Sequence, residues 1–373
     1  MSNLALKISD RFENRRVFFF SQYRLQLNYN SPGSSFSLQM IFDPDNPEHK
    51  ELACVTHYHE VELFYNDQKI LTGVVTNNGF RHAPSKQLAG LSGYSKPGLL
   101  QDCSIPPEAY PLQCDGLSLN QIVRKMTAIW VDGIHSAYGL KIKVDDAVQD
   151  RMNKVISKST ASETDTVFGY LNGLARQRDI IISHTPDGEL LFTQSKTRSE
   201  PFMTIDTTIP DGMRGITTIE LDYDGTGLHS HIYVKGKASK SGDNASDETI
   251  RNPYVVGTVY RPIVISQSSG DDNDTISAAR RALGKELENI KVRITTDRWE
   301  VKNQMILPNS TISIRDPEIY LYNKKNWFVQ SVSYEGTPEK TTATINCVLP
   351  ECFNGDKVES VFRNINLHAL DND

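Results

Sequence analysis

The chain has 373 residues, of which 38% are hydrophobic, and a formal net charge of −6 at pH 7. Its length leaves room for roughly two to four domains, because a single core stops growing at about 250–300 residues. No apolar run approaches the roughly 20 residues that span a bilayer, and the negative charge gives no global field for nucleic acid, so we expect a soluble protein without a membrane-spanning segment.

The N-terminal sequence and the number of cysteines indicate the cellular compartment in which the protein is made. The first residues lack the basic, apolar and small-residue regions of a signal peptide. The five cysteines, an odd number in a long chain, fit reduced thiols. We therefore expect synthesis and residence to begin in a cytoplasm.

Residues 1–97 show the pattern of antiparallel β structure. Residues 22–29 alternate strictly between apolar and polar side chains, and residues 36–42 repeat the alternation after turn residues 30–34. Residues 61–65 are expected to pair with residues 69–75 across Asn66 and Asp67. The alternating apolar positions should face one core: Tyr23, Leu25, Leu27, Tyr29, Phe36, Leu38, Met40 and Phe42. A first compact antiparallel sheet or barrel is predicted here.

Residues 98–158 predict an α/β insert. Pro106, Pro107 and Pro111 mark a loop. Ser118 and Gln121 form a capping box, in which both side chains satisfy free N–H groups at a helix start. The helix that follows should bury an apolar stripe: Leu119, Ile122, Val123, Met126 and Trp130. A short strand is expected at residues 141–144.

Residues 159–200 predict a helix followed by a β-hairpin. Thr160 and Glu163 have the spacing of a second capping box, so the helix is expected to follow them. One helix face then carries a stripe at three- and four-residue spacing: Val167, Phe168, Leu171, Leu174, Ala175 and Arg178. The pattern changes to two β-favouring runs, residues 180–183 and 189–193, joined by a Thr-Pro-Asp-Gly turn.

Residues 201–365 return to β character with one inserted helix. Strands are expected at residues 217–222, 231–235, 312–315, 328–334 and 342–349. Asp274 can cap the helix, whose buried face should consist of Ile276, Ala279, Leu283, Leu287 and Ile290. The polar stretches 236–252 and 267–273 suggest mobile surface loops, and the chain after Phe362, with a tail at residues 366–373, is expected to be poorly ordered.

Two histidine pairs are candidate metal ligands. His57 and His59, followed by Glu60, would place two imidazoles on one face of a strand, and His229 and His231 repeat this spacing. Each pair supplies only two ligands, so a site needs the pairs to converge, and the helical HExxH pattern is absent. Polar residues near strand ends are the preferred interpretation, without a metal.

The cysteines are also more typical of packing than of chemistry. Cys347 and Cys352 lie five residues apart in a strand and the turn after it, with Cys103 and Cys114 elsewhere. Buried thiols that act as small hydrophobes are favoured over zinc ligands or a disulfide.

Glycine-rich and acidic segments contain partial matches to catalytic patterns. Residues 90–94 resemble a nucleophile elbow around Ser92 but lack its final glycine, so a turn is predicted. Residues 225–227 lack the lysine of a phosphate loop and also predict a turn. The carboxylate pairs Asp145–Asp146 and Asp271–Asp272 occur in segments that are expected to be exposed. Acid/base catalysis by two carboxylates requires an apolar pocket that raises the pKa of one of them, and none is expected there.

Three aromatic side chains could be considered as a stacking platform for bases: Trp299, Trp327 and Tyr334. Aromatic residues in strands are usually part of the core, and that is the interpretation preferred here. We therefore predict no catalytic, cofactor-binding or metal site, and no enzyme activity. The sequence does not locate interface residues.

Four segments, taken in order, resemble a known family. The helix TVFGYLNGLARQRDI with the hairpin PDGELLFTQ (residues 166–194) resembles the core of baseplate hub proteins from contractile phage tails, the Mu-type tail protein family. Upstream, LSGYSK (91–96), DCS (102–104) and LSLNQI (117–122) match another family segment. Downstream, YRPIVI (260–265) and WEVKNQMILPNSTISIRDP (299–317) match two more.

The resemblance implies a mainly β fold with α+β inserts. Residues 1–97 and 201–365 would be two copies of one antiparallel, barrel-like tube domain that flank the α/β insert (98–158) and the helix–hairpin (159–200). Three chains would form a ring, so that two tube domains per chain give an approximately six-fold surface on a three-fold particle. The ring would be a symmetry adaptor between the central spike and the tail tube.

The resemblance also implies partners and a location. A trimeric spike protein would dock on one end, and a tail tube or tube-initiator protein on the other. Tape-measure protein and baseplate wedge proteins are further implied partners, with DNA only in transit through the lumen. The implied location is the virion tail baseplate, assembled in the host cytoplasm, without a cofactor.

Two alternatives stay open. One is the amino-terminal, hub-like module of a type VI secretion spike protein, which continues into an oligonucleotide-type fold and a β-helical needle. This sequence ends at Asp373 without a short-period repeat, so we rank that alternative lower. The other is a tail-associated cell-wall hydrolase, which would need an acid/base pair in a cleft.

Overall fold

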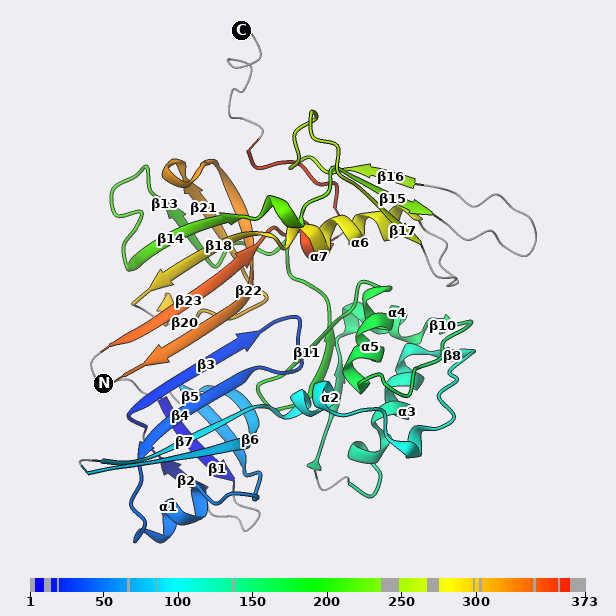
Figure 1. Cartoon of the computed structure of the whole chain (residues 1–373). Helices are drawn as coiled ribbons and strands as arrows, with labels where there is room; N and C mark the ends of the chain where they lie inside the picture. Colours follow the sequence, from blue (N-terminus) through cyan, green and yellow to red (C-terminus); the bar gives the residue numbers. More distant parts are fainter. Residues whose placement is uncertain are drawn as a thin grey trace. The chain divides into compact units, whose positions relative to one another are not determined.

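The computed structural model describes residues 4–9, 15–18, 20–65, 68–84, 86–135, 138–235, 248–266, 275–297, 299–301, 304–337, 340–354 and 356–362 (Figure 1). The fold is mainly β, with one large, mostly antiparallel sheet and four smaller ones. The chain divides into two compact units, Met1–Gln194 with Ser331–Ala343, and Ser195–Gln330 with Thr344–Asp373. The chain passes from one unit to the other after Gln194 and again within two strands, β22 (Leu321–Gly336) and β23 (Thr341–Val348).

The first unit begins with the alternating strands that the sequence predicts. β3 (Gln22–Asn28) pairs antiparallel with β4 (Ser35–Ile41), and the apolar positions of both strands are buried. β5 (Glu60–Tyr65) pairs with β6 (Gln68–Ala83), as expected. The sheet of this unit has the order β22, β3, β4, β7 (Lys86–Ser95), β6, β5, β1 (Leu4–Ser9) and β2 (Arg15–Phe18). A short helix, α1 (Pro47–Leu52), is capped by Asn46.

The expected turn at residues 90–94 is wrong, because these residues are part of β7. β7 pairs with both β4 and β6, and Gly93 lies where the strands approach closely. A Cβ on Gly93 would lie 1.9 Å from the carbonyl oxygen of Val74, so no larger residue fits there without a shift of the backbone.

Residues 97–194 of the first unit form an α/β block. Its helices are α2 (Leu99–Asp102), α3 (Leu119–Val131), α4 (Gln149–Asn153) and α5 (Val167–Arg176). β9 (Ile142–Val144) pairs parallel with β12 (Leu190–Thr193), which pairs antiparallel with β11 (Ile181–His184). β8 (Leu117–Ser118) pairs with β10 (Val155–Ile156). The predicted helices, hairpin and short strand are thus confirmed.

The two predicted capping boxes have different outcomes. Ser118 and Gln121 form the complete box at the start of α3. Thr160 does not cap α5, which begins at Val167 with Thr166 as its N-cap; the Thr166 hydroxyl accepts from Gly169 N at 3.0 Å. Thr160 instead forms an isolated bridge with Gln113, so strand-like pairing keeps this segment extended. The helix therefore starts later than expected.

The α/β block has one core and is anchored to the sheet of its own unit. Val167, Leu171 and Ala175 of α5 are buried with Ile122 and Met126 of α3 in one apolar cluster. The turn at residues 185–188 carries Gly188 at φ +77°, as its sequence predicts.

Three side-chain contacts attach this hairpin to the β sheet of the first unit. Thr72 Oγ1 donates to the Pro186 carbonyl at 2.8 Å, and Lys69 Nζ lies 2.9 Å from Asp187 Oδ1. His184 Nε2 lies 2.6 Å from Ser34 Oγ, and its Nδ1 donates to the Thr185 carbonyl. Burial lowers the pKa of His184.

The second unit contains the other part of the large sheet. Its strands are β14 (Ile216–Tyr223), β18 (Ile290–Thr296), β23, β22, β21 (Thr311–Asp316) and β13 (Met203–Asp206), with β19 (Glu300–Val301) and β20 (Gln304–Met305) as a separate pair. β13 pairs parallel with β21, while β14 with β18 and β21 with β22 are antiparallel. The five strands expected from the sequence are present.

Two helices and a three-stranded sheet complete the second unit: α6 (Thr275–Leu287), α7 (Glu351–Asn354) and the strands β16 (Glu248–Arg251), β15 (His231–Lys235) and β17 (Pro262–Ser266). Ala279, Leu283 and Leu287 of α6 are buried as expected. Ile276 is instead exposed, and Ile290 lies on β18 after the helix has ended. The expected cap Asp274 and the stretches 236–247, 267–273 and 363–373 lie outside the described residues. The end of the expected loop 236–252 is wrong, because residues 248–251 form β16, which pairs with β15.

The strand pairs of the described residues do not close a barrel. The large sheet has an open order that begins at β14 and ends at β2. Among the described residues, no helix is both long and apolar enough to span a membrane.

Candidate interaction surface in the second unit

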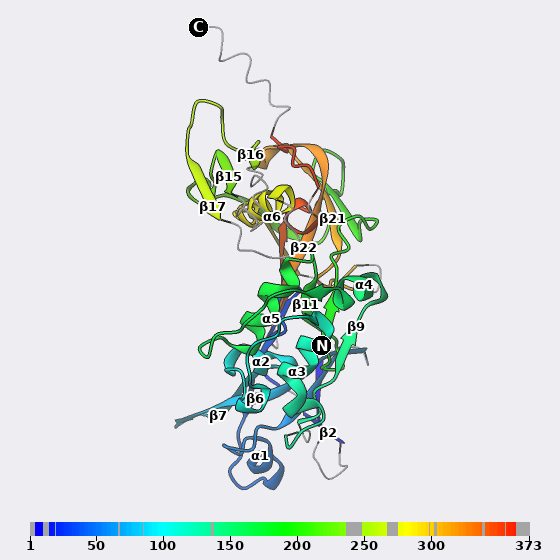
Figure 2. The ribbon, with the colours of Figure 1, turned by 90° about the vertical axis from the view of Figure 1, so that its right-hand side faces the viewer.

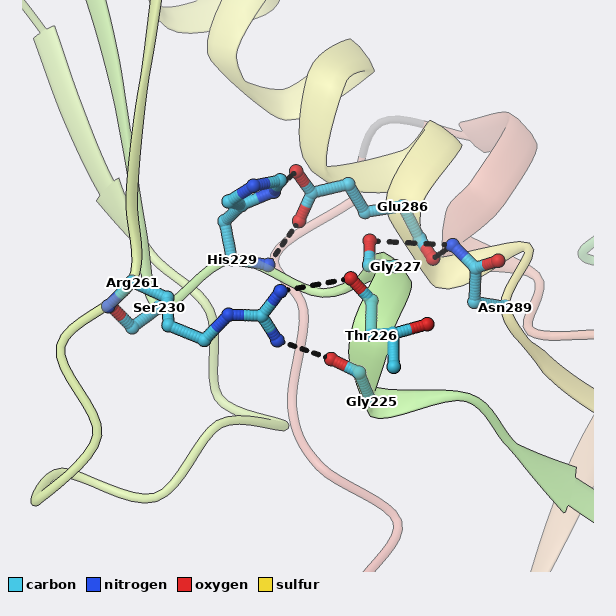
Figure 3. Close-up of polar contacts among 8 residues, drawn as sticks. All are labelled: Gly225, Thr226, Gly227, His229, Ser230, Arg261, Glu286 and Asn289. Carbon is cyan, nitrogen blue, oxygen red and sulfur yellow. Dashed lines mark hydrogen bonds and ion pairs between the residues drawn. The ribbon is translucent and has the colours of Figure 1, made fainter.

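A polar network joins three segments of the second unit (Figure 3). Glu286 of α6 accepts from His229 twice, with Oε2 2.9 Å from the backbone N and Oε1 2.7 Å from Nδ1. The Arg261 guanidinium donates to the carbonyls of Gly225 and Thr226 at 2.6 and 2.9 Å. Asn289 Nδ2 donates to the Gly227 carbonyl at 3.4 Å. The network ties the loop before β15 and the start of β17 to the end of α6.

The sequence explains why these groups converge. Residues 225–227 form the expected turn, a short 3₁₀ segment in which Asp224 accepts from Thr226 N. The Gly225 carbonyl accepts from Leu228 N within the turn, and a guanidinium with several fixed donors can bind this carbonyl and its neighbour at the same time. Arg261 precedes Pro262, which opens β17 and has no N–H of its own. The segment YRPIVI, which resembles the family sequence, therefore has a structural role at this position.

The three-stranded sheet has one covered face and one open face. β15 pairs antiparallel with β16 and parallel with β17, so directly paired residues share a face. Ile232 and Val234 are buried, and α6 contacts β15 and β16 (Figures 1 and 2). The opposite face carries seven described outward positions in these registers: His231, Tyr233, Lys235, Thr249, Arg251, Pro262 and Val264. We call this face, with Tyr260 beside it, the open sheet face.

Aromatic rings gather on the open sheet face. The rings of His231 and Tyr233 are stacked with centroids 6.1 Å apart, and the Tyr260 ring lies 5.5 Å from that of His231. A hydrogen bond with Tyr260 raises the pKa of Tyr233. Tyr260 is 67% exposed and Val264 is 59% exposed. Such a cluster of aromatic and aliphatic groups is typical of a surface that contacts another molecule.

The histidine pairs do not form a common metal site in the part of the chain that is described. His57 and His59 precede β5 rather than lying in it, and Tyr58 between them has φ 49°. His59 Nε2 lies 2.8 Å from the Glu51 carbonyl, and Glu60 pairs with Lys96 at 2.6 Å. Within the described residues, no three His, Cys, Asp or Glu side chains come together as a possible metal-binding group.

The cysteines are free thiols that differ in burial. All five are free; Cys114 and Cys347 are buried, whereas Cys103 and Cys352 are half-buried. Burial raises the pKa of Cys347 and of Cys352, which opposes formation of the reactive thiolate.

The remaining candidates are accounted for by the fold. Trp299, Trp327 and Tyr334 are buried, so the stacking platform is excluded and the core interpretation is confirmed. Asp145 is half-buried and donates its backbone N–H to the Phe192 carbonyl, while Asp146 is exposed. Asp271 and Asp272 lie outside the described residues.

Sequence reasoning missed the open sheet face. One signal was present: residues 231–235 alternate between polar or aromatic side chains and buried aliphatic ones. Which face stays open depends on the placement of α6, because alternation alone does not say which side is covered.

The comparisons with known proteins agree on the fold. Residues 97–194 match the family model "Baseplate hub protein gp44-like, second domain". A tail protein from Neisseria meningitidis has 17% identity and a TM-score of 0.75, with 95% of this chain and 98% of that chain covered. The 43 kDa tail protein of prophage MuSo2 from Shewanella oneidensis has 15% identity and a TM-score of 0.74, covering 94% and 99%.

A more distant likeness extends to secretion systems. The structure of a Francisella PdpA–VgrG complex matches with 8% identity and a TM-score of 0.59, covering 96% of this chain and 59% of that chain. No curated protein matches the chain by sequence. These structural likenesses, all below 25% identity, show a shared fold. Together with the family match, they confirm that the chain resembles the baseplate hub and tail proteins of Mu-type contractile phages.

Proposed function

We propose that this protein is the structural hub of a contractile phage baseplate or of a related injection device. Three chains form a ring that joins the central spike to the tail tube and adapts three-fold to six-fold symmetry. The observation that carries the proposal is the hub-family match over residues 97–194, within a chain whose fold matches two tail proteins over 94–95% of its length.

The large sheet supports a role based on interfaces. Residues 1–97 and 201–365 are proposed as the two tube domains, whose barrel-like closure is completed in the ring by neighbouring chains. The described strand order is open at β14 and at β2, and an open edge carries unpaired N–H and C=O groups that favour pairing with another chain. Each interface between chains should bury on the order of 2,000 Å² or more, as obligate assemblies do.

The proposed partners follow from this position. A spike protein binds one end of the ring, and a tail tube or tube-initiator protein binds the other. Tape-measure protein, wedge proteins and DNA in transit are further proposed contacts. The chain acts in the virion tail without catalysis and without a cofactor.

A second candidate function is the hub-like module of a type VI secretion spike. The likeness to the PdpA–VgrG structure favours it, because 96% of this chain matches 59% of that one. A module of this kind would also be trimeric, so the trimer alone does not separate the two functions. Binding of a separately expressed spike protein would favour the phage hub.

The oligomeric mass tests the proposal. Native mass spectrometry should give a trimer, and Leu25→Pro should abolish it by removing a ladder N–H in β3. The variant Val155→Ala, at an exposed position, is the matched control and should remain trimeric. A monomer that persists at high concentration and in assembled particles would exclude the ring. Tight, salt-sensitive DNA binding, or clearing of peptidoglycan, would contradict the structural role.

A further inference from the structure

The open sheet face and the loop beside it, residues 252–261, form an exposed surface that we call the cationic surface. Lys235 and Arg251 are exposed at its outward positions, and neither forms an ion pair with a described residue. Glu248, the described acidic residue of these strands, shares the covered face with buried Val234. The exposed apolar side chains of the surface are Val256, Val259, Tyr260 and Val264. A partner that presents carboxylates and apolar groups would complement this surface.

The helix α1 and the residues around it form a second exposed surface. Residues 41–51 contain four carboxylates and one lysine. Asp45 and Glu48 are exposed, and neither forms an ion pair with a described residue. The Phe80 ring lies 5.2 Å from the ring of Phe42, so the exposed Phe80 side chain adds an apolar group beside the carboxylates. We call residues 41–51 with Phe80 the acidic surface.

The two surfaces differ in the sign of their charge. Arg81 lies next to Ile41, because both residues pair with Leu88. The four carboxylates of the acidic surface are therefore offset only in part, by Lys50 and Arg81, and two negative charges remain in excess. The cationic surface has no described carboxylate on its open side.

The opposite signs favour one kind of contact between copies of the chain. If either surface met the same surface of a second copy, like charges would lie opposite each other, and such a contact is unfavourable. A contact between the cationic surface of one copy and the acidic surface of another brings opposite charges together. Such a contact is head-to-tail, and it generates a ring when the rotation between copies closes.

We propose that the cationic surface of one chain binds the acidic surface of the next chain in the ring. Asp45 and Glu48 pair with the cations Arg251 and Lys235, and the exposed apolar groups of the two surfaces pack together. The inference rests on the proposed ring and assigns two surfaces to the contact between its chains. This contact adds to the proposed pairing of sheet edges.

Reversal of charge on one surface tests the contact. Lys235→Glu/Arg251→Glu should raise the dissociation constant of the trimer by about tenfold or more, and Asp45→Lys/Glu48→Lys should have the same effect. Sedimentation velocity over a range of protein concentrations measures this constant. The matched control, Lys141→Glu/Lys143→Glu at exposed positions of the α/β block, should change it by less than about twofold.

A variant with both surfaces reversed provides the sharper test. The four substitutions at Lys235, Arg251, Asp45 and Glu48 exchange the signs of the two surfaces, so opposite charges meet again. The trimer should recover to within about threefold of the wild-type dissociation constant. A wild-type trimer that neither double variant weakens would overturn this inference and leave the ring intact. A wild-type monomer would overturn the ring and, with it, this inference.

A cross-linking experiment locates the contact without any change of charge. The photoreactive residue p-benzoylphenylalanine replaces Tyr260, and the variant is assembled from a mixture of unlabelled and ¹⁵N-labelled chains. Mass spectrometry should find cross-links from this position to residues 41–51 or to Phe80 of a different chain. The same probe at the exposed Val155 is the control and should not reach these residues. Cross-links that join Tyr260 only to other segments would refute the assignment even if the charge variants fail to fold.

Discussion

The α/β block of residues 97–194 and the three-stranded sheet β16–β15–β17 differ in how much apolar surface each covers. In the α/β block, the apolar faces of α3 and α5 meet in a single buried cluster. The three-stranded sheet packs one face near α6 and leaves aromatic and aliphatic groups on the other face exposed. The first arrangement is sufficient for folding, and the second is suited to a contact with another chain. Function in this protein is therefore expected at exposed faces rather than in a cleft.

Core truncation should give the largest contrast between the two regions. Phe192 of β12 is fully buried, so Phe192→Ala should lower the free energy of unfolding by about 3–5 kcal/mol. Val264→Ala on the open sheet face should change it by less than about 0.5 kcal/mol. Urea denaturation of both variants measures this difference. Similar losses would show that the sheet face is as closely packed as the core.

Loss of the Glu286 carboxylate should have the next largest effect. Glu286→Ala leaves the His229 N–H and Nδ1–H without their acceptor, which should cost about 1–3 kcal/mol because both lie in a half-buried site. The exchange of backbone amide hydrogens in β15 should also accelerate in this variant. The control Glu220→Ala removes an exposed pair with Arg293 and should cost at most about 1 kcal/mol. Unchanged exchange in β15 would mean that the network does not hold the sheet.

The start of α5 gives a smaller, well-defined effect. Thr166→Ala removes the observed N-cap and should destabilise the protein by about 1 kcal/mol. Thr160→Ala, at the position that the sequence pattern suggested as the cap, should cost less than about 0.5 kcal/mol. Thermal unfolding of the two variants distinguishes the two helix starts. A larger loss from Thr160→Ala would place the functional cap at the earlier residue.

The smallest effect near neutral pH should come from His184. The neutral ring donates through Nδ1 to the Thr185 carbonyl and accepts at Nε2 from the Ser34 hydroxyl. Burial lowers its pKa in the folded state, so the unfolded chain binds the proton more readily. Stability should therefore fall as the pH drops through the unfolded value of about 6.5 toward the folded pKa.

The variant His184→Gln should show a flatter dependence of the free energy of unfolding on pH over this interval. Wild-type and variant proteins can be compared by urea denaturation at several pH values between 7.5 and 5. A steeper dependence in the variant would show that other groups dominate the acid response.

Local signals were sufficient for much of the α/β block. Ser118 and Gln121 fix the start of α3, and the spacing of Val167, Leu171 and Leu174 defines the buried face of α5. The turn at residues 185–188 contains the proline and glycine that its geometry requires. These features depend on neighbours within one turn of chain, so sequence reasoning finds them.

Other features depend on contacts that are distant in sequence. Residues 90–94 look like a turn, yet they lie in β7 because two strands, β4 and β6, pair with them. Thr160 has the spacing of a cap, but its segment pairs with Gln113 instead. In both cases, pairing with a distant segment overrides a local preference of comparable size.

The sequence by itself determined the mainly β character, the helix–hairpin and the resemblance to baseplate hub proteins, because periodicity and ordered motifs are properties of the chain alone. Only the tertiary structure decided that the large sheet stays open within the described residues, and that His229, Arg261 and Glu286 meet in one network. It also decided which face of the three-stranded sheet is exposed. Alternation specifies that a strand has two different faces, but the element that packs against one of them is chosen by long-range packing.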